Sequence, residues 1–277
     1  NRGIAKRKLE DYYGAIADYT KAVEIDPNYA YAYHNRGNAK SDLKDYYGAI
    51  SDYSKTIEID PNYSVAYFNR GIAKRKLEDY YGAIADYTKA VEIDPNYAYA
   101  YHNRGNAKSD LKDYYGAISD YSKTIEIDPN YSVAYNNRGN AKSDLKDYYG
   151  AIADYTKAIE IDPNYAYAYN NRGIAKRKLE DYYGAIADYT KAVEIDPNYA
   201  YAYHNRGNAK SDLKDYYGAI SDYSKTIEID PNYAYAYTGR GISKENVGDL
   251  SGACADWRKA ADLGNESAAQ WVKDQCN

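Results

Sequence analysis

Several residue types are scarce or missing. Methionine is absent from the 277 residues, and there are one phenylalanine, two tryptophans and two cysteines. A chain read from its own start codon would begin with methionine, so we expect a processed product or a part of a longer chain. No stretch approaches the roughly 18 apolar residues that a membrane-spanning helix needs, so we expect no membrane insertion. The net charge of −5 offers no basic face, so we expect no nucleic-acid partner.

Patterns typical of enzymes are also missing. The three histidines, His34, His102 and His204, lie 68 and 102 residues apart, too far apart in a repeating chain to share one metal ion. There is no supported Ser/His/Asp or Cys/His arrangement and no glycine-rich phosphate loop. We therefore expect no cofactor and no catalysis.

The sequence is instead built from repeats. The triplet Asn-Arg-Gly recurs at positions 1, 35, 69, 103, 137, 171 and 205, and Gly239-Arg240-Gly241 continues the series. Residues 1–68 and 69–136 differ only at their last position, Phe68 against Asn136. A constant step of 34 residues predicts stacked units that share their core with their neighbours.

Each unit has the pattern of two helices. In residues 30–63, the inner positions of the first helix are spaced by four, three and four residues: Ala32, Arg36, Ala39 and Leu43. The inner positions of the second are Tyr46, Ala49, Ile50, Tyr53 and Ile57. Pro61 ends this helix because proline lacks an amide donor and disfavours helix in the residue before it.

This unit resembles the tetratricopeptide repeat. The family's aromatic, small and proline positions are matched in order by Tyr33, Gly37, Tyr46, Ala49, Tyr53 and Pro61. The resemblance covers residues 1 to about 264. It departs at Arg36, Lys40 and Thr56, where the family usually or often has leucine, tyrosine and alanine. It implies an all-α, right-handed superhelical solenoid of 34-residue helix-turn-helix repeats, with a concave groove and no chemistry of its own.

Three parts are expected along the chain: a near-identical array at 1–233, a diverged last repeat at 234–264 and a C-terminal capping helix at 265–277. The first unit lacks the start of its first helix, so its stacking face is expected to be open to a second chain or to upstream residues. Cys254 and Cys276 lie eleven residues on either side of Asn265. An antiparallel hairpin would bring them together, which predicts a disulfide; two buried free thiols are the alternative.

Each unit places an arginine within its apolar stripe. A buried guanidinium needs a partner, and the candidate is the aspartate sixteen residues later. We expect a structural ladder of ion pairs, with ligand binding by the arginines as the alternative. The pairs are Arg2–Asp18, Arg36–Asp52, Arg70–Asp86, Arg104–Asp120, Arg138–Asp154, Arg172–Asp188, Arg206–Asp222 and Arg240–Asp256.

The groove lining is implied by the resemblance alone. It falls at Tyr31, His34, Asn38, Ser41 and Asp42 in the second unit, and at Val65, Phe68, Ile72, Arg75 and Lys76 in the third. Basic and Ser-Asp units roughly alternate, which gives no continuous anion track and no Lys/Asn clamp for a peptide carboxylate. A solvated tyrosine-rich surface and a peptide-binding groove both remain open.

Tyrosine is the main peculiarity, with forty copies. The positions of Tyr31, Tyr47 and Tyr63 are extra to the family pattern, and the diverged unit has Ser251 at the Tyr47 position. Tyrosine favours interfaces, so we expect contacts with another chain or a glycan, unless these rings only cover helix seams.

The expected location is outside the cytoplasm. A structural disulfide indicates an oxidising compartment, and three glycosylation sequons agree with it, at Asn62, Asn130 and Asn265. We expect a secreted or extracellular protein, with the periplasm as the alternative. Two functions remain open: a structural subunit that associates with further copies of itself into a filament-like assembly, and a monomeric adaptor that binds a partner peptide in the groove.

Overall fold

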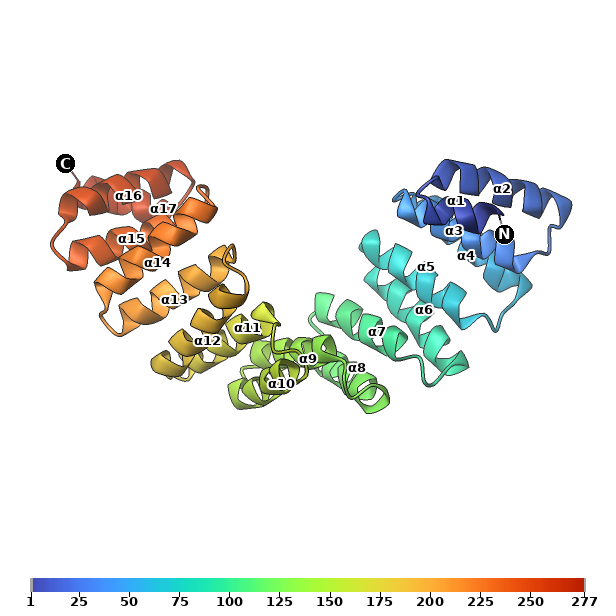
Figure 1. Cartoon of the computed structure of the whole chain (residues 1–277), viewed down its shortest axis with the longest axis horizontal. Helices are drawn as coiled ribbons and strands as arrows, with labels where there is room; N and C mark the ends of the chain where they lie inside the picture. The colour runs from blue at the N-terminus through green and yellow to red at the C-terminus, as the bar shows by residue number, and fades with distance from the viewer. Residues whose placement is uncertain (1, 277) are drawn as a thin grey trace. The chain divides into compact units, whose positions relative to one another are not determined.

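A computed structural model describes residues 2–276 (Figure 1). Within these residues there are seventeen α-helices and no strand, and the helices pack as consecutive 34-residue repeats. The all-α solenoid predicted from the sequence is confirmed. Asn1 and Asn277, the outer ends of the predicted array and capping segment, lie outside the described residues.

Each repeat contributes a first and a second helix. The first helices are α1 (Arg2–Lys8), α3 (Ala30–Asp42), α5 (Ser64–Lys76), α7 (Ala98–Asp110), α9 (Ser132–Asp144), α11 (Ala166–Lys178), α13 (Ala200–Asp212) and α15 (Ala234–Asn246). The second helices are α2 (Tyr12–Ile25), α4 (Tyr46–Ile59), α6 (Tyr80–Ile93), α8 (Tyr114–Ile127), α10 (Tyr148–Ile161), α12 (Tyr182–Ile195), α14 (Tyr216–Ile229) and α16 (Leu250–Asp262). One further helix, α17 (Glu266–Gln275), follows the last repeat.

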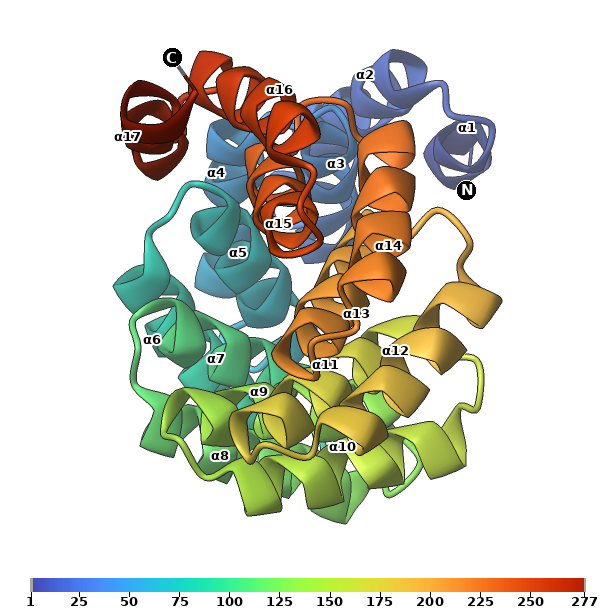
Figure 2. The same ribbon diagram turned by 90° about the vertical axis from the view of Figure 1, so that its left-hand side faces the viewer.

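The chain forms two compact units, Asn1–Ala141 and Lys142–Asn277, whose boundary falls within α9. In the first unit, α1 to α7 each pack on the next helix in the chain, and in the second unit the same holds for α10 to α16. Figure 2 shows α17 beside α16. Within the described residues no helix is long and apolar enough to cross a membrane.

The start of each second helix explains the recurring Asp-Tyr-Tyr-Gly. In α4, Asp45 is the N-cap, and its carboxylate accepts the backbone N–H of Gly48 at 2.9 Å. A Cβ at Gly48 would lie 2.1 Å from that carboxylate. Glycine is therefore required for the cap as it stands.

The core is made of small residues against tyrosine rings. Gly37 of α3 lies against Tyr53 of α4, and a Cβ there would come within 2.7 Å of the ring. Tyr53 is buried together with Ala49 and with Ala73 of the next repeat. The glycines inside the first helices thus allow the close helix contact that offsets their low helix propensity.

The turn between the two helices of each repeat has an unusual backbone. A non-glycine residue adopts φ between 62° and 64° at Glu10, Lys44, Glu78, Lys112, Lys146, Glu180 and Lys214. The diverged repeat has Gly248 at this position, with φ 87°. Glycine adopts this conformation without a steric penalty, whereas a side chain costs about 1 kcal/mol or more.

The C-terminal end contains the disulfide between Cys254 and Cys276, with Cα atoms 5.5 Å apart. It joins α16 to the residue that follows α17. Trp257 of α16 and Trp271 of α17 have ring centroids 5.4 Å apart. Helix α17 therefore covers the end of the last repeat with an apolar contact and a covalent link.

Candidate functional site

The arginine of each first helix is engaged with an aspartate of the second. Arg36 donates to both carboxylate oxygens of Asp52, at 2.7 and 2.9 Å, and Lys40 approaches the same carboxylate at 2.8 Å. Asp52 is 3% exposed. Arg36 also donates to Thr20 of the preceding repeat and lies over the Tyr33 ring. With these partners the side chains hold two repeats together and are not available to a ligand.

The same geometry recurs in both compact units. The equivalent pairs are Arg70–Asp86, Arg104–Asp120, Arg172–Asp188, Arg206–Asp222 and Arg240–Asp256, with closest N–O distances of 2.6 to 2.7 Å, and Arg2 pairs with Asp18. Arg138 belongs to the first unit and Asp154 to the second. Within their own units, Arg138 donates to Ser122 at 3.0 Å and Asp154 accepts from Lys142 at 2.7 Å.

Two of the expected groove residues pack into or against the core: His34 is buried and Phe68 is half-buried. His34 is 5% exposed, and its ring lies 4.9 Å from Tyr63 and 5.7 Å from Tyr53 between centroids. Phe68, at the same position of the next repeat, packs on the rings of Tyr87 and Tyr97. This corrects the expected lining: the position points between helices, because its ring fills the space beside the buried tyrosine of the second helix.

Burial determines the charge of the histidines. It lowers the pKa of His34 to about 4, aided by the nearby Arg7 guanidinium, and the pKa values of His102 and His204 are lowered equally. The amide nitrogen of Asn137 lies 3.1 Å from His102 Nε2, which can accept this hydrogen bond only when that nitrogen carries no proton. The histidines are therefore neutral core residues.

Three other expected groove residues line one cavity. Asn38, Ser41 and Asp42 surround about 290 Å³ together with side chains of the neighbouring repeats. Asn38 Oδ1 accepts the hydroxyl of Tyr53 at 2.9 Å and the amide of Asn69 at 3.0 Å. Asn38 thus joins Tyr53 and Asn69 by hydrogen bonds in the wall of the cavity.

Arg75 and Lys76 line a second kind of cavity, of about 440 Å³, in which Arg75 pairs with Asp110 at 2.7 Å. The other residues around it are Ile72, Glu78, Tyr80, Tyr87 and Asn103. A cavity of about 340 Å³ is lined by the residues at the same repeat positions 68 residues earlier: Ile4, Arg7, Lys8, Glu10, Tyr12, Tyr19, Asn35 and Asp42.

These two cavities each contain a polar group without a partner. The buried hydroxyls of Tyr87 and Tyr19 have no hydrogen-bond partner among the described residues. The cause is Ile72 and Ile4, which stand where Asn38 accepts the hydroxyl of Tyr53. Sequence reasoning missed these tyrosines, although the Ile-for-Asn alternation was the signal that could have found them.

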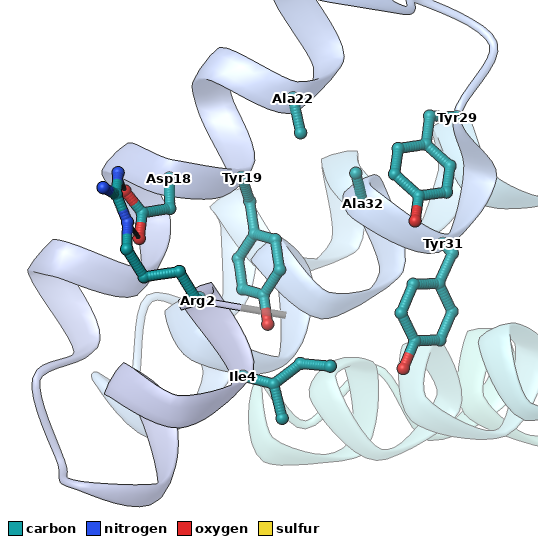
Figure 3. Close-up of a pocket in the computed structure, with 9 residues that line it drawn as sticks. Arg2, Ile4, Asp18, Tyr19, Ala22, Tyr29, Tyr31 and Ala32 are labelled. Atoms are coloured by element: carbon teal, nitrogen blue, oxygen red, sulfur yellow. Dashed lines mark hydrogen bonds and ion pairs between the residues drawn. The ribbon is translucent and has the colours of Figure 1, made fainter.

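Tyr31, another expected groove residue, lines a different cavity of about 240 Å³ between α1, α2 and α3. Val65 is exposed. Figure 3 shows Tyr19, Tyr29 and Tyr31 around it, with the Arg2–Asp18 pair at its edge. Helix α1 has seven residues and α3 has thirteen. The shorter helix explains the space, so we assign no ligand to it.

The most exposed rings are seven tyrosines at the second position of the second helices. Their exposed fraction lies between 75% and 77% at Tyr13, Tyr47, Tyr81, Tyr115, Tyr149, Tyr183 and Tyr217. In the diverged repeat Ser251 occupies this position, and α16 still forms. The fold therefore does not need an aromatic ring there.

The three sequon asparagines differ in setting. Asn62 and Asn130 are exposed in the turns between repeats. Asn265 is the N-cap of α17, and its side-chain oxygen accepts the N–H of Ala268 at 2.9 Å. Among the described residues no group of three or more His, Cys, Asp or Glu side chains could hold a metal ion.

Family comparison agrees with this geometry. The tetratricopeptide repeat model matches residues 30–63, 64–97, 98–131, 132–165, 166–199 and 200–233, and a second model, described as TPR repeat, matches 3–44. The chain belongs to the tetratricopeptide repeat family. It is a repeat scaffold of the kind that mediates protein–protein interaction, and such scaffolds are typically non-catalytic. No curated protein matches the chain.

Solved structures show the same fold. MamA is 28% identical with a TM-score of 0.55, over 60% of this chain and 96% of that one. YrrB, described as a TPR protein with an unusual peptide-binding site, is 25% identical with a TM-score of 0.57, over 68% and 97%. The C-terminal part of a TPR repeat-containing protein from Cytophaga hutchinsonii is 22% identical with a TM-score of 0.70, over 86% and 98%. This last likeness concerns the fold alone.

Proposed function

We propose that this tetratricopeptide repeat protein is a structural scaffold that associates with further copies of itself outside the cytoplasm, in a filament-like assembly. The observation that carries the proposal is the set of seven tyrosines exposed to the same degree in seven consecutive repeats. A ring that is three-quarters exposed contributes little to the core of its own repeat. It offers a large contact area with few rotatable bonds, which suits an interface.

The disulfide and the exposed sequons support the proposed location. A disulfide that fastens the last helix persists in an oxidising compartment. The exposed Asn62 and Asn130 are open to glycosylation in a secreted or extracellular protein. In the periplasm the disulfide would form equally well, and these asparagines would stay unmodified.

Sedimentation velocity over a range of concentrations, with electron microscopy of the same samples, tests self-association. We expect larger species to grow with concentration. Replacing all seven tyrosines by serine, the residue that the diverged repeat tolerates, should return the chain to a monomer. The matched control replaces them by phenylalanine, which keeps the rings. A chain that is monomeric at every concentration refutes the proposal.

A second candidate function is an adaptor that binds a partner peptide. The two equivalent cavities favour it, because each is lined by an arginine and a lysine and contains a buried tyrosine hydroxyl that lacks a hydrogen-bond partner among the described residues. The peptide-binding site named for YrrB points to the same use of the fold. Replacing Ile72 by asparagine would offer Tyr87 the partner that Tyr53 has in Asn38. Binding to a peptide library should then weaken at this cavity.

A further inference from the structure

The second compact unit carries a continuous row of tyrosine rings. Ring centroids lie 5.0 Å apart for Tyr167 and Tyr199, 5.3 Å for Tyr201 and Tyr233, and 6.4 Å for Tyr233 and Tyr235. Burial raises the pKa of Tyr199, and Tyr167 and Tyr201 add to the shift, so Tyr199 links the two halves of the row. We define the tyrosine row as Tyr165, Tyr167, Tyr199, Tyr201, Tyr233 and Tyr235.

Each of three consecutive repeats supplies two of these rings. Tyr167, Tyr201 and Tyr235 are the second residues of α11, α13 and α15, and their exposed fractions are 58%, 59% and 67%. The other three tyrosines of the row are the N-cap residues of the same helices and are half-buried. The half-buried rings thus support the exposed rings from below.

The fold does not require an aromatic ring at the exposed position. In the first compact unit the equivalent residues are Tyr31, Val65, Tyr99 and Val133, and the helices with valine still form. Tyr31 and Tyr99 are therefore separated by a repeat that has no tyrosine at this position. The first unit has the same helices with an interrupted row, which makes it a natural control for the second.

The rings of the row are inclined to one another. The angle between ring planes is 55° for Tyr167 and Tyr199, 88° for Tyr201 and Tyr233, and 65° for Tyr233 and Tyr235. The rings thus form V-shaped pairs instead of one flat platform. A flat sugar ring stacks best on a broad open face, whereas proline-rich segments in the polyproline II conformation dock between aromatic side chains.

The spacing of the row agrees with a polyproline II helix. This helix has three residues per turn and rises about 3.1 Å per residue, so one turn advances about 9 Å. Helix α13 contacts both α11 and α15, and contacting helices lie about 8 to 10 Å apart. Each repeat therefore meets about one turn of such a ligand. The ligand has no internal hydrogen bonds, so its carbonyl oxygens are open to the tyrosine hydroxyls.

The charges beside the row are acidic. Burial, the neighbouring tyrosines and Asp230 raise the pKa of Tyr233 to about 12, and Asp196 contributes in the same way at Tyr199. These hydroxyls therefore keep their protons and can donate. Lysine and glutamate side chains at the ends of the same second helices pair with each other and add no net charge: Lys191–Glu194 and Lys225–Glu228. The row thus favours a ligand with basic residues over one with acidic residues.

We infer that the tyrosine row of the second compact unit binds a proline-rich segment of another protein in the polyproline II conformation, with the tyrosine hydroxyls donating to its carbonyl oxygens. The partner is another protein because this chain has seven prolines, each isolated in a turn between repeats. The inference goes beyond the self-association proposed above and does not depend on it.

A labelled peptide tests the row directly. The probe is a proline homopolymer about twelve residues long, or about four turns, with a lysine at each end. Fluorescence anisotropy measures its dissociation constant. We expect it to bind the unaltered chain, and a glycine-serine peptide with the same lysines to bind at least about tenfold more weakly, because it has no preformed helix.

Three substitutions remove the exposed rings. The variant Tyr167→Val, Tyr201→Val and Tyr235→Val introduces the residue that the first unit has at this position, so we expect it to fold. It should bind the proline probe at least about tenfold more weakly. Phenylalanine at the same three positions keeps the rings and should cause a smaller loss. The matched control, Tyr31→Val with Tyr99→Val, should leave the dissociation constant unchanged, and circular dichroism checks folding.

The outcomes decide the inference separately from self-association. Loss of binding in the triple valine variant, with an unchanged control, supports the row as the site. Equal binding in the triple valine variant, or no binding by the unaltered chain, overturns the inference. If instead a β-linked glucose oligosaccharide binds and the triple valine variant loses it, the row is a glycan site. Repeating the measurement in the seven-serine variant described above, which keeps the tyrosine row, gives the same decision whether or not the chain associates.

Discussion

Acid should destabilise the protein through its three histidines, of which His34 and His102 are buried and His204 is half-buried. The folded pKa of each is about 4, below the ordinary value of 6.5, because burial disfavours the charged ring. The unfolded chain therefore binds more protons than the folded chain between pH 6.5 and 4. Stability is greatest above this window and falls as the pH is lowered through it.

The size of the effect follows from the two pKa values. Lowering the pH from 7 to 4.5 should remove roughly 2.5 kcal/mol of stability for each histidine, and about 7 kcal/mol for the three together. Asparagine is a suitable substitution, because Asn136 and Asn170 are buried at the same position of other repeats. Replacing His34, His102 and His204 by asparagine should remove this part of the pH dependence.

Urea unfolding, followed by circular dichroism at several pH values, compares the two chains. Proton NMR of the imidazole rings gives the three pKa values directly in the folded state. The reasoning is refuted if the triple asparagine variant loses as much stability in acid as the unaltered chain, or if the rings titrate near pH 6.5.

Three further changes probe the fold. Lys112→Gly should raise the free energy of unfolding by about 0.5 to 1 kcal/mol, because glycine adopts the positive φ without steric strain. Lys112→Ala, which keeps a Cβ, should not raise it, and urea unfolding distinguishes the two variants. Asp120→Ala should lower the free energy of unfolding by about 3 kcal/mol or more, because Arg104 loses its buried partner. The double variant Arg104→Met with Asp120→Leu should lower it by less. An equal or greater loss in the double variant would contradict this account. Reducing the disulfide between Cys254 and Cys276 should lower the stability of the last repeat by roughly 3 kcal/mol. The fluorescence of Trp257 and Trp271, whose rings pack together there, reports the melting of this repeat. An unchanged melting curve would show that α17 is held by packing alone.

The fold could be predicted from the repeat pattern because every unit shows the same apolar positions. The spacing of Ala32, Arg36, Ala39 and Leu43 predicts the inner face of the first helix, and Pro61 predicts where the second helix ends. The arginine and aspartate sixteen residues apart could be matched because a buried charge must be neutralised locally. The expected disulfide could be placed from the position of Asn265 between the cysteines. These inferences depend on local geometry, which sequence spacing contains.

The groove could not be read in the same way. Whether the position of His34 faces a groove or the core depends on how the first helix is rotated against the next repeat, and neighbouring side chains decide that rotation. The partner of a tyrosine hydroxyl also depends on a residue fifteen positions away, as Asn38 is from Tyr53. The strained turns were missed because Lys and Glu are ordinary turn residues until the backbone angle is known.

The cavity linings recur every 68 residues, while the exposed tyrosines and the buried tyrosine and alanine positions recur every 34. Ile72 and Arg75 occur in one kind of repeat, and Asn38 and Asp42 in the other, so the cavities and the turn charges come in pairs of repeats. The extra copy at 137–170 interrupts this order. Asp42 and Asp110 each have an arginine 35 residues before them in the sequence, whereas Asp144 has Ser109 at that distance. Burial then raises the pKa of Asp144. The pair of repeats, and not the single repeat, is therefore the unit in which a ligand of these cavities should be sought.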